Sequence, residues 1–367
     1  MKIKYHYKMT WFFFGLLFCC SSFGETLLLK DLAGREVQFP RDPRKIVGIG
    51  PGALRLLVYL QAQDKVAGVE KMEKMSFRGR SYWIAHSELW DLPECGPGGP
   101  GGINHKPDPA SIMMVNPQVI FVTCMDGPLA DEAMKTSGIP FVILSYGEPG
   151  GSDEVLFESL KISGKILNRE KRADDVIAYF ESVRKDLDQR TRAISRKQRP
   201  SVYVGGIGHK GLFGIESTEK SFIPFSRVNA KNLCEDLETR IGNHLFLNRE
   251  DLLRMNPDVI FIDGGGLNSV TEDFFKKPEY YFSFKAFSER AVHTLLPVNA
   301  YGTNLCTALA DAYAVGKILY PAAFKDIDPE KKADEIYTFL VGKPVYESMK
   351  KDYGPLGAVV PFLKPEE

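Results

Sequence analysis

The clearest pattern of hydrophobic and polar positions occurs twice, about 140 residues apart along the chain. Residues 115–122 read VNPQVIFV, and residues 255–262 read MNPDVIFI. Each copy is an apolar, β-rich run that follows a helix-like stretch, PASIMMV or REDLLRM, with an Asn-Pro pair between the two. Proline cannot continue a helix, and the residue before it avoids the helical region. Both copies therefore predict a helix, a sharp stop and a buried strand.

The surroundings of each copy are also repeated. The strand-like run KIVGIGPG (45–52) lies upstream of the first copy, and PSVYVGGIG (200–208) lies upstream of the second. Coincidence is the alternative, because such a phrase suits any α/β protein, but the matching order on both sides favours a repeated unit. The pattern predicts an α/β fold of two similar Rossmann-like lobes with mainly parallel central sheets.

The stretch between the two units predicts one long α-helix. Proline is absent from it until Pro200, and apolar residues recur at helical spacing. A helix over 170–197 would be on the order of 40 Å long, at 1.5 Å per residue. A surface helix within one lobe would show the same spacing, but the position between the repeats favours a rigid strut that joins the lobes. The apolar positions are Val176, Ile177, Phe180, Val183 and Leu187.

The first residues have the pattern of a secretory signal peptide. A basic start, MKIKYHYK, precedes the short apolar run MTWFFFGLLFCC, and small residues follow, which predicts cleavage after Gly24. A membrane anchor is the alternative, but the run is short for a span, which needs roughly 20 apolar residues. Lipidation at Cys19 or Cys20 is a third interpretation. It is weakened because Phe18, rather than a small residue, precedes Cys19.

A chain of 367 residues has the length expected of two domains, which agrees with the two predicted lobes. The tail after residue 342, GKPVYESMKKDYGPLGAVVPFLKPEE, has no counterpart in the repeat, and the sequence assigns it no place. The predicted parts are a signal peptide (1–24), an N-terminal α/β lobe (25–152), a linking helix region (153–198), a C-terminal α/β lobe (199–325), and a C-terminal helix and tail (326–367).

Charge and cysteine content limit the function. Lys+Arg and Asp+Glu are both 47, so no excess of positive charge supports a nucleic-acid partner. None of the four cysteines beyond residue 24 belongs to a C-x-x-C pair, so a zinc or redox motif is not indicated. Export would permit oxidation, but in a domain of this size we expect buried thiols. These cysteines are Cys95, Cys124, Cys234 and Cys306.

Candidate ligand-binding residues lie among glycine-rich turns that follow the predicted strands. In open α/β sheets, ligands bind beyond the carboxyl ends of the strands, and glycine lets the backbone approach a ligand closely. The mixture of cations and aromatic rings there suits a bulky, oxygen-rich, anionic ligand in a cleft between the lobes. The candidates are Arg55, Tyr82, Trp83, His105, Tyr146, His209, Lys210, Tyr301 and Asn304.

Several candidates have a structural alternative. Tyr82 and Trp83 are equally compatible with core packing, and His105 with a solvated loop. Arg55 fits an exposed helix position, although it is the one charge in the apolar stretch GALRLLVYL. The turn that contains His209 and Lys210 is polar and glycine-rich, without an obvious core role, which favours ligand binding.

The sequence contains no catalytic motif of the kinds G-x-S-x-G, H-E-x-x-H or Walker A, and its histidines lack metal-ligand spacing. We therefore expect no enzyme activity, no cofactor and no bound metal ligand set. The rival interpretation is an NAD-dependent oxidoreductase, because GIGPGA after a strand, with Glu70 about 20 residues further on, nearly completes a dinucleotide fingerprint. The signal peptide counts against it, since exported compartments rarely offer nicotinamide cofactors.

An ordered set of segments over 25–342 carries a family resemblance. The set includes KIVGIGPGALRLLVYLQAQDKVAGVE, PDPASIMMVNPQVIFV, SGIPFVIL, REDLLRMNPDVIFID and ALADAYAVGKILYP. It resembles the periplasmic substrate-binding proteins of ABC importers for iron–siderophore, haem and cobalamin complexes. The resemblance implies a periplasmic monomer that captures a metal complex and closes only slightly. An iron chelate is the first expectation, with cobalamin, haem or another chelated metal as alternatives.

The resemblance also implies a partner, the importer's permease in the inner membrane. Binding proteins of this class usually present one acidic residue on each lobe to arginines of the permease. In this sequence the matching segments contain Asp131 and Glu132 in the first lobe and Glu235 and Glu238 in the second. Glu132 and Glu235 are the docking residues that we expect.

Overall fold

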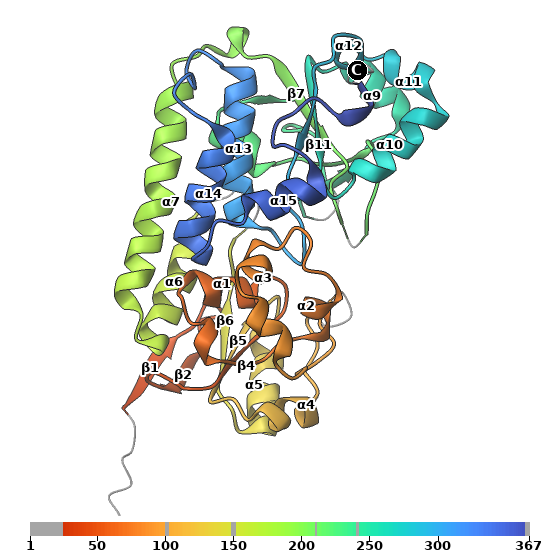
Figure 1. Ribbon diagram of the computed structural model, residues 1–367. Helices are drawn as coiled ribbons and strands as arrows, with labels where there is room; N and C mark the ends of the chain where they lie inside the picture. Colours follow the sequence, from red (N-terminus) through yellow and green to blue (C-terminus); the bar gives the residue numbers. More distant parts are fainter. Residues whose placement is uncertain (1–24, 100–102, 148–151, 210, 240–241, 364–367) are drawn as a thin grey trace, which may run out of the picture.

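The computed structural model describes residues 25–99, 103–147, 152–209, 211–239 and 242–363, which form two α/β lobes (Figure 1). Each lobe contains a four-stranded parallel sheet. The first sheet has the order β4-β3-β5-β6 and the second has the order β12-β11-β7-β9. The strands of the first are β3 (Ile46–Ile49), β4 (Val66–Gly68), β5 (Val119–Thr123) and β6 (Phe141–Leu144). Those of the second are β7 (Ser201–Gly205), β9 (Lys231–Asn232), β11 (Val259–Asp263) and β12 (Val292–Leu295).

The two sheets repeat one another. Taken from its other edge, the second sheet has the order β9-β7-β11-β12, which matches β4-β3-β5-β6 position by position. The two copies of the repeated phrase form the equivalent strands β5 and β11, and each pairs in parallel with the strand predicted upstream of it, β3 or β7. This arrangement confirms the predicted pair of similar lobes.

The helix before each repeated strand ends at an asparagine. α4 (Pro109–Val115) stops at Asn116 and α9 (Arg249–Met255) stops at Asn256, and both asparagines are left-handed, with φ of 46° and 40°. Asparagine tolerates this conformation, which reverses the chain before the proline. The local sequence therefore determines where each helix ends and each strand begins.

The long helix that joins the lobes is α7 (Glu170–Thr191), which follows α6 (Glu154–Leu167). Its predicted apolar stripe, from Val176 to Leu187, is buried. The helix has 22 residues and is roughly 33 Å long at 1.5 Å per residue. It ends earlier than the predicted residue 197, because Ser195 caps a separate short turn, η4 (Arg196–Gln198), through Gln198.

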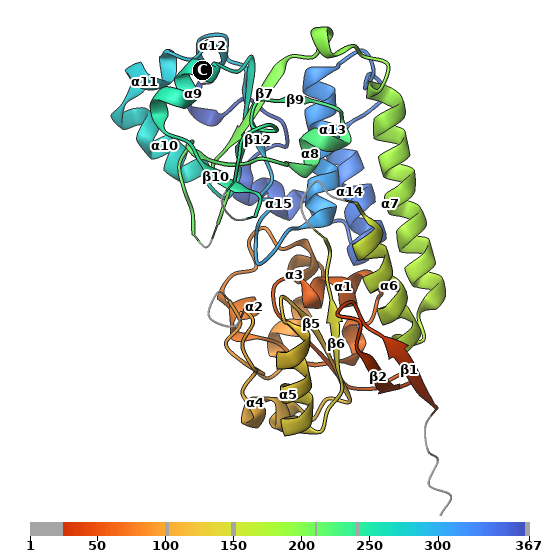
Figure 2. The ribbon, with the colours of Figure 1, turned by 180° about the vertical axis from the view of Figure 1, so that it is seen from behind.

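A helical layer connects the lobes in addition to α7. α13 (Leu305–Leu319) and α14 (Pro329–Val341) pack against each other and lie beside α7 (Figures 1 and 2). α13 contacts α8 (Ile223–Arg227) of the second lobe, whereas α14 contacts α1 (Ala53–Tyr59) and α3 (Ser81–Ala85) of the first. One continuous hydrophobic core consequently includes residues from both sheets, and a wide hinge motion would disturb its packing.

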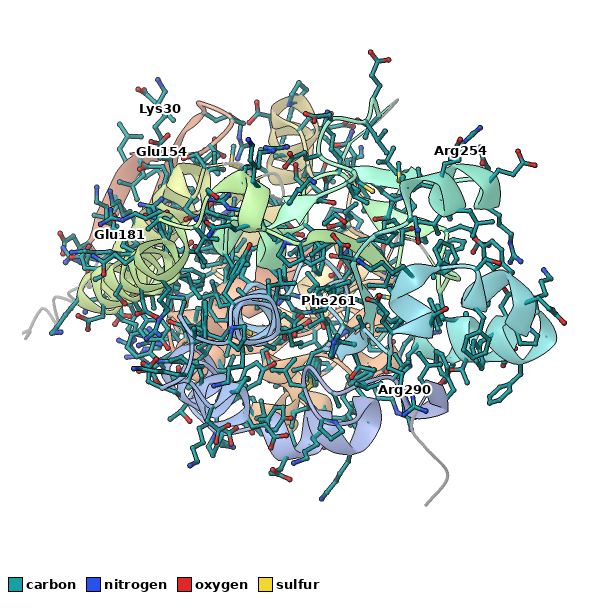
Figure 3. The ribbon with its side chains drawn as sticks, turned by 90° about the horizontal axis from the view of Figure 1, so that it is seen from above. Lys30, Glu154, Glu181, Arg254, Phe261 and Arg290 are labelled. Carbon is teal, nitrogen blue, oxygen red and sulfur yellow. The ribbon has the colours of Figure 1, made fainter. Side chains whose placement is uncertain are left out.

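The remaining helices cover the outer faces of the two sheets. Viewed from above, Phe261 of β11 lies near the middle of the molecule, while Glu181 and Arg254 project from its opposite sides (Figure 3). α4 and α5 pack on the first sheet, and helices α9 to α12 pack on the second. No helix among the described residues is both long enough and apolar enough to span a bilayer. The bounds not yet given are η1 (Gln63–Lys65), α2 (Lys71–Met75), η2 (Ser87–Asp91), α5 (Gly127–Ser137), β8 (Ser217–Glu219), β10 (His244–Phe246), α10 (Leu267–Lys276), α11 (Pro278–Phe282) and α12 (Lys285–Ser288).

The two chain ends cover equivalent sheet edges. In the first lobe the hairpin of β1 (Thr26–Lys30) and β2 (Glu36–Pro40) lies against β6, where the Asp31 carboxylate accepts the Ile143 N–H at 3.1 Å. In the second lobe the tail after α15 (Tyr346–Tyr353) pairs with β12 and ends in η5 (Pro361–Leu363). Both edge strands are therefore shielded from pairing with other chains.

Candidate functional site

The loop that follows β12 brings the second lobe against strand-end turns of the first. We call residues 298–304 the interlobe loop. It folds back on itself through a bridge between Asn299 and Thr303, and its Tyr301 is left-handed, with φ of 54°. Because β12 leads into it and α13 begins directly after it, this loop is positioned by both the second sheet and the shared helical layer.

Arg55 of α1 holds the interlobe loop. Its guanidinium donates to backbone carbonyls along the loop, at 2.5 Å from Nη1 to Thr303 O and 3.1 Å from Nη2 to Tyr301 O. It also lies 5.1 Å from the ring centroid of Tyr82 and is 1% exposed. A ligand reaches this guanidinium only if the loop moves, so the geometry gives Arg55 a connecting role between the lobes.

Tyr301 and Glu70 form a hydrogen-bonded pair between the lobes. The Tyr301 hydroxyl donates to Glu70 Oε2 at 2.6 Å and accepts the Gly99 N–H at 3.1 Å. Glu70 follows β4 and also accepts the Gly50 N–H at 3.0 Å. Three strand-end turns, after β3, β4 and β12, thus meet at one carboxyl group.

Burial changes the titration of this pair. It raises the pKa of Glu70 from 4.5 to about 7, and the hydrogen bond from Tyr301 opposes part of that rise. The nearby Glu73 carboxylate raises the pKa of Glu70 further, whereas the Gly50 N–H lowers it. Burial and the Glu70 carboxyl raise the pKa of Tyr301 far above 10, so its hydroxyl is neutral at pH 7.

Replacing Glu70 by glutamine should alter how stability depends on pH. A carboxyl with a raised folded-state pKa stabilises the protein fully below its unfolded pKa, near 4.5, and loses that contribution as pH rises through about 7. Between about pH 5 and pH 8, we expect the unfolding free energy of the parent to fall by about 2 kcal/mol more than that of Glu70→Gln. Urea unfolding at both pH values measures the difference.

The matched control is Glu132→Gln, which makes the same substitution at an exposed carboxyl of the first lobe and is unfolded at the same two pH values. Other buried carboxyls with raised pKa values, such as Glu219 and Asp263, remain in all three proteins, so the comparison isolates Glu70. Equal slopes for the parent and Glu70→Gln would contradict the prediction.

Tyr82 and Trp83 lie in the core of the first lobe, where they converge on Glu73. Tyr82 Oη donates to Glu73 Oε2 at 2.8 Å, and Trp83 Nε1 donates to the same oxygen at 2.5 Å. Arg80 pairs with it at 3.2 Å and lies 5.4 Å from the ring centroid of Tyr301. Tyr82 and Trp83 are thus buried in the core, which is the packing alternative that the sequence left open beside ligand contact.

Tyr146 and Asn304 also lie where the lobes meet. The Tyr146 hydroxyl donates to Pro51 O at 3.1 Å, and a Cβ placed on Gly302 would lie 2.5 Å from that hydroxyl oxygen. Only glycine fits at that position, which has φ of 84°. Asn304 is buried and donates from Nδ2 to Val298 O at 3.2 Å, closing the base of the interlobe loop.

The predicted histidines lie on separate loops. His105 is exposed, and its Nδ1 lies 2.7 Å from Ile103 O. His209 is exposed on the loop that follows β7, and its ring stacks on His244 with centroids 4.3 Å apart. Lys210 lies outside the described residues, as do residues 1–24 with Cys19 and Cys20.

The predicted docking residues lie in different kinds of position. Glu132 is exposed on α5 and pairs with Lys106, while Glu235 is half-buried after β9 and accepts from Arg196 at 2.5 Å. In the second lobe, the residue whose position matches that of Glu132 is Glu272 and not the predicted Glu235. Glu132 is the sixth residue of α5, and Glu272 is the sixth residue of α10, the helix in the equivalent position of the second lobe.

Sequence analysis missed the buried acids of the site. Glu219 accepts from Asn299 at 2.8 Å, and Asp263 accepts the Val298 N–H at 2.9 Å, so both carboxyls hold the interlobe loop from the side of the second lobe. Burial raises the pKa of each to about 7. The signal available for Asp263 was its place at the end of the repeated strand, directly before three glycines.

In the structure, the glycine turn and the glutamate that suggested a dinucleotide site contact the interlobe loop instead. Glu70 faces the Gly50 N–H and the Tyr301 hydroxyl, and the interlobe loop packs against the same glycine turn.

The described residues contain no group of three or more His, Cys, Asp and Glu side chains that could hold a metal ion. Cys95, Cys234 and Cys306 are buried thiols, as expected, whereas Cys124 is exposed, so that expectation was wrong for Cys124.

A separate groove of about 400 Å³ opens at the carboxyl ends of β5 and β6. Its lining is mostly apolar and contains none of the residues of the Glu70–Tyr301 pair. The residues that line it are Leu32, Ala33, Cys124, Met125, Ile143, Leu144, Ser145 and Val155.

The chain is similar to known proteins in sequence and in structure. The chain is 22% identical over 329 residues to the molybdate-binding protein MolA of Haemophilus influenzae, covering 84% of this chain and 89% of that protein. It is 20% identical to YvrC of Bacillus subtilis, an uncharacterized ABC transporter substrate-binding lipoprotein, over 81% of this chain and 87% of the relative. The solved structure of molybdate-bound MolA matches with a TM-score of 0.69 at 18% identity, covering 87% of this chain and 98% of that one.

A second solved structure has the same fold. The periplasmic solute-binding protein from Veillonella parvula matches with a TM-score of 0.68 at 15% identity, covering 90% of this chain and 97% of that one. The family described as periplasmic binding protein matches residues 111–297, which is more than half of the 367 residues. This chain belongs to the periplasmic binding protein family.

Proposed function

We propose that this protein is the substrate-binding component of an ABC importer, which captures a metal complex between its lobes and delivers it to a permease in the inner membrane. The observation that carries the proposal is the pair of equivalent parallel sheets whose strand-end turns meet through the interlobe loop. Ligands of open α/β sheets bind at such strand ends. The proposed action is binding and release without bond-making chemistry.

An iron chelate is the first ligand that we propose. His209 lies exposed on the loop after β7 and offers a polar group to an oxygen-rich complex, and Lys210 would add a positive charge. The Tyr301 hydroxyl would contact the ligand by exchanging its hydrogen bond to Glu70. Cobalamin, haem and other chelated metals belong to the same class. Molybdate is the second candidate, because MolA, a relative over most of the chain, is a molybdate-binding protein.

The shared core limits how the protein responds to its ligand. A ligand that contacts both lobes favours the closed arrangement in proportion to the extra contacts it makes there. Because α13 and α14 bind the lobes into one core, we infer a small closure rather than a wide hinge motion. The permease would then distinguish loaded from empty protein by the spacing of surface residues on the two lobes.

Native mass spectrometry of the protein purified from its own host tests the ligand and the export together. We expect the bound mass of a metal complex, and a chain mass that fits cleavage after Gly24. Titration calorimetry then compares a ferric siderophore, haem, cobalamin and molybdate on the emptied protein. Saturable binding of at least one is expected, whereas binding of a nicotinamide dinucleotide and none of these would overturn the proposal.

Uptake of the identified ligand by the host tests the partner. Glu132→Lys should reduce uptake without reducing ligand affinity, because charge reversal opposes docking on a permease arginine. Glu235→Lys tests the predicted residue of the second lobe in the same way, and Glu272→Lys tests its structural alternative. Glu181→Lys on the exposed face of α7 is the matched control. Normal uptake with all three docking variants would contradict docking through these acids.

A further inference from the structure

The second lobe carries a group of aromatic rings beside its strand ends. The loop after β7 supplies His209 and Phe213, and strand β10 supplies His244 and Phe246. The His209 and His244 rings are stacked, 4.3 Å apart with 12° between their planes. Phe246 stands edge-on to both His244 and Phe213, at 4.6 Å and 4.8 Å. We call these four residues the aromatic platform.

A short hairpin holds the platform in place. β10 pairs antiparallel with β8, and His244 and Phe246, two residues apart on one strand, project to the same side of it. His244 Nε2 and the Ser217 hydroxyl of β8 are within hydrogen-bonding distance at 2.8 Å. The rings therefore stand on a paired backbone, with one imidazole fixed by a hydrogen bond.

The stacked imidazoles do not form a metal site in this arrangement. The lone pairs of an imidazole lie in the plane of its ring, and a zinc ion binds such a nitrogen at about 2.0–2.1 Å. Nearly parallel rings with centroids 4.3 Å apart direct their lone pairs along separate lines, so the two rings cannot share one ion. Burial and the neighbouring His209 lower the pKa of His244 to about 4, so this imidazole is uncharged at pH 7.

The platform is partly exposed, through His209 and Phe246, and borders the proposed ligand region. Phe246 is 57% exposed, and the adjoining Leu212 is 68% exposed. A Cβ on Gly265, at the end of β11, would lie 3.8 Å from Leu212, and one on Gly208 would lie 3.5 Å from the Asn299 carbonyl of the interlobe loop. Large apolar groups exposed together beside strand ends are typical of a binding surface.

We propose that the aromatic platform binds an aromatic ring in the organic shell of the transported metal complex. An imidazole stack with an edge-on phenyl ring presents a flat π face and a perpendicular wall, which together accommodate a third ring by offset or edge-to-face packing. This inference rests on the proposed function, and it selects a ring-bearing chelate such as a catecholate over an aliphatic chelate or a bare oxyanion.

Fluorescence or calorimetric titration with three probes tests the proposal: ferric enterobactin, which carries catecholate rings, ferrioxamine B, which is aliphatic, and molybdate. The wild type should bind ferric enterobactin most tightly. Phe213→Ala/Phe246→Ala should weaken that binding about fivefold or more, because two ring contacts are lost. The matched control is Phe275→Ala/Phe282→Ala on α10 and α11, where the rings are 68% and 50% exposed, and it should bind like the wild type.

Conservative variants separate ring stacking from simple apolar contact. Phe246→Trp should retain binding of ferric enterobactin, and Phe246→Leu, which keeps apolar bulk without a ring, should weaken it about threefold. The leucine variant also serves where the double variant does not fold. Equal binding by the wild type and Phe246→Leu, or preference of the wild type for ferrioxamine B or molybdate, would overturn the platform while leaving the proposed function intact. A wild type that binds no metal complex or oxyanion overturns both.

Discussion

Arg55→Ala should lower the free energy of unfolding by about 2–4 kcal/mol. The guanidinium is buried and donates to the carbonyls of residues 300–303, so its removal leaves backbone acceptors of the interlobe loop without these donors. An unsatisfied buried acceptor costs about 1–3 kcal/mol, and the cavity beside Tyr82 adds to the loss. Urea unfolding of the parent and variant, followed by circular dichroism, measures the change.

The control for this experiment is Arg254→Ala. Arg254 is also a helical arginine, but it is exposed and its ion pair is with Asp251 three residues away, so we expect a change within about 0.5 kcal/mol. Arg55→Lys separates charge from geometry, because one ammonium cannot reach the set of carbonyls that a planar guanidinium spans. Unfolding of Arg55→Ala at the same urea concentration as the parent would show that the interlobe loop does not depend on this contact.

The repeated strands were predictable because their signals are local. The Asn-Pro pair, the apolar run after it and the helix before it lie within one short window, and the structure places them as α4 with β5 and as α9 with β11. The buried stripe of α7 was predictable for the same reason, since helical spacing depends only on residues three or four apart.

Partners of the site residues could not be predicted in this way, because they are distant in sequence. Arg55 contacts carbonyls about 245 residues further along the chain, and Glu70 meets Tyr301 at a separation of 231 residues. From the sequence, Arg55 was compatible with ligand binding or with an exposed helix face. Only the folded chain shows that it is buried beneath the interlobe loop.

Polar groups in the core were hidden for a related reason. Tyr82 and Trp83 were recognisable as large aromatic residues. Glu73 lies in the run KMEKM, which gave no sign that this glutamate is buried. In the structure Tyr82, Trp83 and Arg80 all donate to one oxygen of the Glu73 carboxylate, Oε2, and these contacts offset part of the cost of its burial. Composition alone does not reveal such clusters, since an exposed glutamate on a short helix has the same local sequence.

The tail after α15 had no sequence counterpart, yet it completes the second lobe. Gly357 N–H donates to Thr294 O at 2.9 Å, Thr294 N–H donates to Ala358 O at 2.9 Å, and Val360 N–H donates to Val292 O at 3.0 Å. Val360 and Leu363 are buried in the hydrophobic core of that lobe, where Phe362 packs on Phe274 with ring centroids 4.6 Å apart. The tail therefore acts as a further edge of the sheet.

Deleting residues 354–367 should destabilise the protein by about 3 kcal/mol or more and promote self-association. Each buried aliphatic side chain contributes about 1.5–3 kcal/mol, and the conformational freedom that the removed residues no longer lose offsets part of that sum. The deletion also exposes the backbone of β12 as an unpaired edge, which invites pairing with other chains. Urea unfolding measures the stability, and size-exclusion chromatography with light scattering measures the oligomeric state.

A chain that ends at Leu363 is the matched control, because it keeps every tail contact described above and should behave like the parent. Val360→Asp tests the same surface without shortening the chain, since it places a carboxylate in the core of the second lobe, where an unpaired charge is strongly unfavourable. Arg78 of the first lobe pairs with Asp352 of α15 at 3.5 Å, and this contact lies outside the deleted segment, so we expect the loss of stability to centre on the second lobe. Unchanged unfolding and a monomeric state after the deletion would mean that β12 does not need this cover.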